Sequence, residues 1–101
     1  MRMLLHVDMP VEPFNTLVRN GTAGQKLRQI LEAIKPEAAY FTELNGRRSG
    51  ILIVNMTDVS QIPALAEPFF LNFNAAVQIR PVMTPEDLGR ANLDDLGKKW
   101  G

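Results

Sequence analysis

The feature that most constrains the fold is a hairpin signal in the middle of the chain. Asn45-Gly46 separates two strand-like runs, Ala38–Leu44 and Arg47–Met56. Asparagine and glycine readily adopt the positive φ angles of a two-residue type I′ turn, and this turn matches the twist of paired strands. We therefore predict an antiparallel hairpin.

The turn also fixes which hairpin residues share a face. With Asn45-Gly46 at the tip, Tyr40 lies opposite Ile51 and Glu43 lies opposite Arg48, where we expect an ion pair. Strand side chains alternate between the two faces of a sheet. One face then carries Phe41, Leu52, Val54 and Met56, and the other carries Tyr40, Thr42, Ile51, Ile53 and Asn55.

A strand and a helix precede the hairpin. Residues Arg2–Asp8 alternate so that one face is wholly apolar, which predicts a strand. Apolar residues then recur every three or four positions from Phe14 to Ile34, which predicts an amphipathic helix. Gly21 and Gly24 weaken its middle, since glycine in a helix costs roughly 1 kcal/mol relative to alanine. We expect one continuous helix; the alternatives are a break into two pieces at these glycines or a close approach to the sheet there.

A second helix follows the hairpin. Its apolar stripe runs from Ile62 to Phe73, and Asp58 or Ser60 can cap it. Pro68 lies inside this stripe, where it removes one backbone hydrogen bond and clashes with the preceding turn. We expect a kink or an early helix end one residue before Pro68.

The last strand-like run, Ala76–Met83, completes the order β, α, β, β, α, β. This order is typical of the ferredoxin-like α+β fold, a four-stranded antiparallel sheet with two helices on one face and the first and third strands central. The two most continuously apolar runs, Met3–Val7 and Ile51–Val54, fall in those strands, as covered strands require. We predict one such domain over residues 1–83, followed by a C-terminal helical extension at 84–101.

The second face of this sheet stays apolar although no helix covers it. Leaving large apolar side chains in water forfeits about 1.5–3 kcal/mol each. The same face of a second copy can cover it, giving a dimeric α/β barrel with twofold symmetry, or the C-terminal segment can fold back over it. We expect the homodimer. The residues concerned are Leu4, Tyr40, Ile51, Ile53 and Val82.

Composition narrows the function classes. Eleven basic and eleven acidic residues cancel, so charge favours neither nucleic acid nor an anionic membrane surface. The chain has no cysteine, which removes disulfides, thiolate ligands and thiol nucleophiles. No apolar run approaches the length of about 20 residues that a membrane span needs. We expect a cytoplasmic protein with no membrane or nucleic-acid partner.

His6 is the only histidine, and alternation places it on the second face. Histidine titrates near physiological pH, so His6 and Tyr40 are our candidate catalytic residues. Arg80 and Asn55 are the candidate substrate-binding residues, since a guanidinium holds anionic groups well. The alternative is that His6 is only a hydrogen-bonded residue of a dimer interface. Gln78 and Asp8 are its other candidate neighbours.

We expect no metal and no cofactor, because a single histidine would have to recruit scattered carboxylates. Trp100, beside the C-terminus, is either an anchor on a partner surface or a loose tail.

Several segments carry a resemblance to a known superfamily. They are Met3–Val7, Ile51–Val54, Ala66–Phe70 and Val77–Val82. With them the chain resembles the dimeric α/β barrels, which include muconolactone isomerases, cofactor-free monooxygenases and uncharacterised families. Asn45–Arg48 and Met83–Leu88 look more like an uncharacterised family within that group. The resemblance implies the fold and the dimer, and it assigns no catalytic residue.

Two functions remain open. In the first, the chain binds or transforms a small organic molecule between two sheets, with isomerase-like or cofactor-free monooxygenase-like chemistry. In the second, it is a non-enzymatic assembly or regulatory module. Whether it is an enzyme is left undecided by the sequence.

Overall fold

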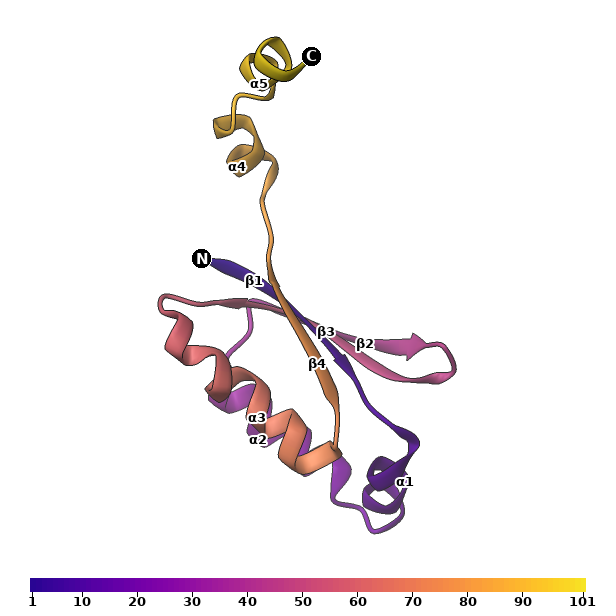
Figure 1. The fold of residues 1–101 in the computed structure, drawn as a ribbon. Coiled ribbons are helices and arrows are strands. Elements are labelled where there is room, and N and C mark those ends of the chain that lie inside the picture. Colours follow the sequence, from indigo (N-terminus) through magenta and orange to yellow (C-terminus); the bar gives the residue numbers. More distant parts are fainter.

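The computed structural model describes all 101 residues, and its centre is one antiparallel sheet (Figure 1). The strands lie in the order β2-β3-β1-β4, so that β1 and β3 are central, as predicted. The architecture is α+β and is compatible with a ferredoxin-like fold. The strands are β1 Arg2–Asp8, β2 Ala38–Leu44, β3 Arg47–Asn55 and β4 Ala76–Pro81.

The β2–β3 hairpin has the predicted register. Tyr40 pairs with Ile51 and Glu43 pairs with Arg48, while Asn45 and Gly46 adopt φ angles of 55° and 78° at the tip. The turn residues therefore set the pairing of the two strands, as their backbone preferences predict.

The expected ion pair between Glu43 and Arg48 is wrong. The Glu43 carboxylate accepts the backbone N–H of Gly46 at 3.1 Å instead. Arg48 turns toward helix α1 (Val11–Arg19), where its guanidinium lies 4.6 Å from the ring centroid of Phe14 and donates to Asn15 Oδ1 at 2.7 Å. A stacked, hydrogen-bonded arginine holds its place better than an exposed ion pair, which is worth at most about 1 kcal/mol.

The predicted first helix is two helices. Helix α1 spans Val11–Arg19 and α2 spans Ala23–Ile34. Gly21 lies between them with φ 79°, a left-handed conformation that glycine adopts without a steric penalty. The continuous helix that we expected is therefore wrong, and the alternative of two pieces is confirmed.

Helix α3 spans Ile62–Phe73 and passes through Pro68, so the early end is wrong. Burial of its apolar stripe outweighs the lost backbone bond, since Phe69 is 1% exposed and Phe73 is fully buried. The side chain of Asn72 also donates to the Pro68 carbonyl at 2.8 Å. A single 3-10 turn, η1 Val59–Gln61, precedes α3.

The hydrophobic core lies between the sheet and helices α1, α2 and α3, which all cover the same face (Figure 1). The side chains of Leu5, Val7 and Leu52 at its centre are 0% exposed. These residues come from the two central strands, so β1 and β3 join the sheet to the helical layer.

Beyond β4 the chain leaves the sheet (Figure 1). The strand ends at Pro81, two residues before the predicted end, because β1 begins at Arg2 and offers no partner beyond the bond from Val82 N to Arg2 O. Helix α4 spans Pro85–Arg90 and α5 spans Leu93–Trp100. None of the helices in the chain combines the length and the apolar character that crossing a membrane requires.

Candidate functional site

The sheet face opposite the helices is open, and we call it the open face. Its apolar side chains are only partly buried in the single chain, and Tyr40 is 66% exposed. The open face carries Leu4, His6, Tyr40, Leu44, Ser49, Ile51, Ile53, Gln78 and Arg80. Val82, which is bonded to Arg2 O beyond the end of β4, continues this face by alternation.

Sheet register brings His6 beside polar groups from two neighbouring strands. His6 lies opposite Ile51 on β3 and opposite Gln78 on β4. Its Nε2 is 2.9 Å from Ser49 Oγ, and its Nδ1 is 3.4 Å from Gln78 Oε1. Arg80 Nη2 donates to the same Gln78 oxygen at 3.1 Å. Four side chains from three strands thus form one hydrogen-bonded chain.

This arrangement selects one tautomer of the neutral His6 ring. Gln78 Oε1 can only accept hydrogen bonds, so the ring nitrogen that faces it, Nδ1, carries the proton. Nε2 then accepts a hydrogen bond from the Ser49 hydroxyl. The guanidinium of Arg80 fixes the orientation of the Gln78 amide, because its N–H must meet the oxygen and not the NH2 group.

A shallow hollow of about 300 Å3 lies over this chain of side chains. Three apolar residues and two polar ones, Leu4, Leu44, Ile51, His6 and Arg80, line it. Small-molecule sites typically combine apolar walls with a few polar groups that fix orientation. The hollow therefore suits a small molecule with an apolar body and an anionic group.

The structure does not bring the other two candidate residues to this hollow. Tyr40 lies on the same row as His6 but with Ile51 between them, so their backbones are about 10 Å apart. Asn55 is four residues along β3 from Ile51, and its Oδ1 accepts a hydrogen bond from the N-terminal ammonium of Met1 at 2.9 Å.

Ser49 is the residue of the site that sequence reasoning missed. It is the one buried polar residue of the chain, 1% exposed, and it is the direct partner of His6. The alternation of β3 places Ser49 on the open face, but a serine in a strand carries no signal of its partner. Asp8, another predicted neighbour of His6, pairs instead with Arg47 at 2.7 Å.

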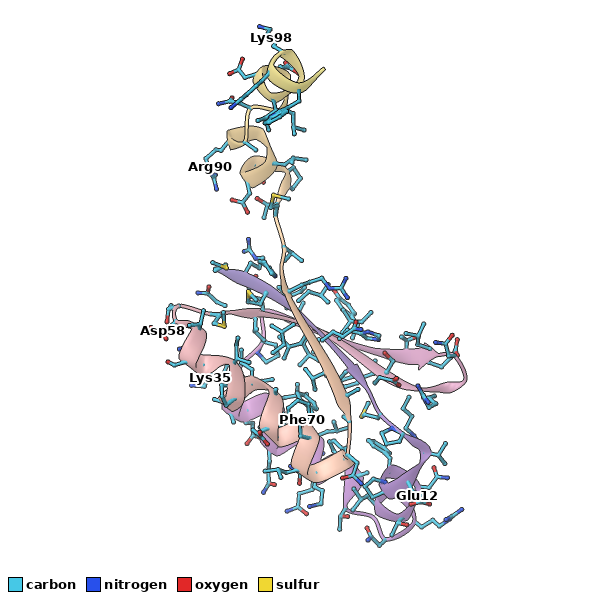
Figure 2. All side chains as sticks on the ribbon, viewed as in Figure 1. Glu12, Lys35, Asp58, Phe70, Arg90 and Lys98 are labelled. Carbon is cyan, nitrogen blue, oxygen red and sulfur yellow. The ribbon has the colours of Figure 1, made fainter.

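Carboxylates with shifted pKa values lie at helix and turn starts and not in the hollow. Hydrogen bonds from Thr16, chiefly from its hydroxyl, lower the pKa of Glu12. Hydrogen bonds from Ser60 lower the pKa of Asp58, and the backbone N–H of Thr84 does the same for Asp87. Figure 2 labels Glu12 and Asp58, both at the edge of the helical layer. These carboxylates stabilise the first turns of helices.

Nowhere in the chain do three His, Cys, Asp or Glu side chains gather in a way that could hold a metal ion. The polar groups of the hollow are an imidazole, a guanidinium, an amide and a hydroxyl, which suit hydrogen bonding to an organic ligand.

Comparison with known proteins adds no relative. No protein-family model matches the chain, and no curated protein sequence matches it.

Proposed function

We propose that this chain binds a small organic anion in the hollow of the open face, and that it does so as a homodimer of the dimeric α/β-barrel type. The observation that carries the proposal is the chain of hydrogen bonds Ser49–His6–Gln78–Arg80 beneath an apolar-walled hollow. Arg80 supplies the positive charge for the anionic group, and Leu4 and Ile51 contact the apolar body.

The contact between His6 and Gln78 leaves room for a ligand to compete. At 3.4 Å it is a long hydrogen bond, whereas the bond from Ser49 at 2.9 Å is of ordinary length. A bound carboxylate can therefore take the Nδ1 proton of His6 as a hydrogen bond while Ser49 keeps the ring in place. An isomerase reaction would need one ring nitrogen of His6 to be released from its present partner, so that this nitrogen can take a proton from the bound molecule and return it.

The exposure of the open face supports the proposed homodimer. A single chain leaves Tyr40 and Leu44 66% and 42% exposed and half-covers Leu4, Ile51 and Ile53. Covering such side chains stabilises by about 1.5–3 kcal/mol for each one fully buried. A second copy offers the same surface, so twofold pairing would close both hollows at once.

A ligand screen by thermal unfolding tests the binding site. Small aromatic and aliphatic carboxylates should raise the melting temperature, because a ligand at 100 times its Kd stabilises by about 2.7 kcal/mol. Arg80→Gln should abolish the shift. Arg28→Gln is the matched control, since Arg28 is an exposed arginine of α2 on the helical side.

A screen in which no carboxylate shifts the melting temperature would contradict the proposal. So would a ligand whose shift is equal in wild type and Arg80→Gln.

One observation favours a second function, a non-enzymatic assembly module. Both ring nitrogens of His6 are already engaged within the chain, by Ser49 and by Gln78, as in a residue that only shapes an interface. A blank screen together with a weaker dimer in His6→Ala would support this alternative.

A further inference from the structure

The last 18 residues, 84–101, form a separate arm made of α4 and α5. Figure 2 shows it standing clear of the sheet, with Arg90 and Lys98 marking its two helices. No residue of α4 or α5 is buried. All four of its large apolar residues are exposed, namely Leu88 at 42%, Leu93 at 56%, Leu96 at 44% and Trp100 at 77%.

The arm has strong local signals but no core of its own. Thr84 and Asp87 form a reciprocal capping box at the start of α4. The helices have six and eight residues, however, and isolated helices this short are marginal in water. A hollow of about 610 Å3 between the two helices stays open to solvent, and only two of its eight lining residues, Leu88 and Leu93, are hydrophobic. Because its helices are short and its large apolar side chains are exposed, the arm needs an apolar surface to pack against.

The shape of the chain shows how much surface is left uncovered. Its radius of gyration is 16.9 Å, whereas a compact chain of this length has roughly 13 Å. Its accessible surface is 6887 Å2, about 1,200 Å2 more than the roughly 5,700 Å2 of a compact 11.3-kDa monomer. A stable interface buries about 800 Å2 on each partner. The extra accessible surface of this chain is therefore large enough to form one such interface.

The connection between sheet and arm keeps the arm away from its own sheet. Prolines at 81 and 85 have fixed φ angles, and each holds the residue before it in an extended conformation. Val82 is tied to the sheet by its bond to Arg2 O. Of the three residues between the prolines, only Met83 is free of these restraints. A connection this short leaves the arm little room to fold back, and short hinges favour exchange between copies.

We propose that the arm is exchanged in a homodimer: the apolar side of α4 and α5 of one copy packs on the open face of the other, at the rim of the paired sheets. The proposal rests on the homodimer of the proposed function. A second copy is the occupant because this chain carries both halves of the contact, an arm without a core and an open face whose apolar side chains no helix covers.

Trp100 reports the position of the arm directly, because it is the only tryptophan. The experiment records its emission spectrum and its quenching by acrylamide over a dilution series of the full chain, with sedimentation velocity at the same concentrations. We expect the blue-shifted, protected emission of a buried indole in the dimer and the red-shifted, quenchable emission of an exposed one as the dimer dissociates.

Each other outcome overturns the exchange in a distinguishable way. A dimer in which Trp100 stays exposed rejects the arm contact and leaves the homodimer standing. A monomer with Trp100 protected at every concentration means that the arm folds back on its own sheet, and a monomer with Trp100 exposed throughout rejects both contact and dimer.

Two matched substitutions locate the contact. Leu96→Asp should weaken the dimer roughly tenfold to hundredfold, the change expected for losing one buried leucine from an interface. Leu71→Asp is the control, since Leu71 is 79% exposed on α3 on the helical side. Equal dimer affinity in the two variants would refute the arm contact, and unchanged far-ultraviolet circular dichroism would show that both fold.

Discussion

The hydrogen bond between Ser49 and His6 gives the sharpest prediction for the site. Ser49 is 1% exposed, and Ser49→Ala removes its hydroxyl, which lies 2.9 Å from His6 Nε2. A net hydrogen bond contributes about 0.5–1.5 kcal/mol, and water can reach the half-buried imidazole in part. We expect the free energy of unfolding to fall by about 1 kcal/mol, which lowers Tm by roughly 4–8 °C in a domain of this size.

A double-mutant cycle isolates the bond from other effects of the substitution. Urea unfolding of Ser49→Ala, His6→Ala and the double variant should give a coupling energy of about 1 kcal/mol. Long-range 1H–15N NMR is unambiguous here because His6 is the only histidine. It should show the proton of the neutral ring on Nδ1. Additive substitutions, or a proton on Nε2, would refute the proposed arrangement.

Three further predictions concern the scaffold. Gly24→Ala should stabilise the chain by up to about 1 kcal/mol, since the new methyl group enters open space on a helix. Gly46→Ala should destabilise it by about 1–2 kcal/mol, because residue 46 has a φ of 78°, which strains a residue with a side chain. The midpoints of urea unfolding measure both effects. Phe69→Ala should cost about 3–5 kcal/mol because the ring is 1% exposed, which calorimetry measures. Hydrogen bonds lower the pKa values of Asp58 and Asp87, so these two carboxylates should contribute to the free energy of unfolding. We expect this contribution to be fully present above about pH 5 and to be lost as the pH falls below about 4, which urea unfolding at a series of pH values measures.

Each of these has a clear contrary result. Shifts of the same sign for the two glycine substitutions would contradict the role of backbone conformation. A loss below about 1 kcal/mol for Phe69→Ala would mean that α3 is not held by its buried stripe. If Asp58→Asn and Asp87→Asn lose stability at low pH in the same way as the wild type, the two carboxylates are not the cause of that loss.

Local signals account for what the sequence could predict. Asn45-Gly46 sets both the turn and the register of the hairpin, because two residues decide the geometry. Thr84, Pro85 and Asp87 likewise start α4 as their capping preferences predict. In both cases the residues that decide the structure are adjacent in the chain.

The predictions that failed concern residues whose structure is decided by contacts with residues far away in the sequence. Pro68 is unfavourable in a helix by local rules, yet burial of Phe69 and Phe73 keeps α3 continuous. Arg48 sits opposite Glu43, but Phe14 and Asn15, which are more than thirty residues away, offer it a better place. Sequence reasoning weighs neighbours and cannot weigh these alternatives.

The site was predicted in part for the same reason. Alternation alone puts His6, Gln78 and Arg80 on one face, and the structure brings them together. Helices join β1 to the other strands, so no turn fixes their register, and the sequence could not place Ser49 diagonally beside His6. Asn55 shares the face but lies at the far end of its strand.

Sedimentation equilibrium of the full chain at micromolar concentration tests the central claim most directly, namely that a second copy covers the open face. The account predicts a species of about 23 kDa, twice the mass of the 11.3-kDa chain, that dissociates when Ile51 is replaced by lysine. A folded 11.3-kDa monomer at every concentration would contradict it.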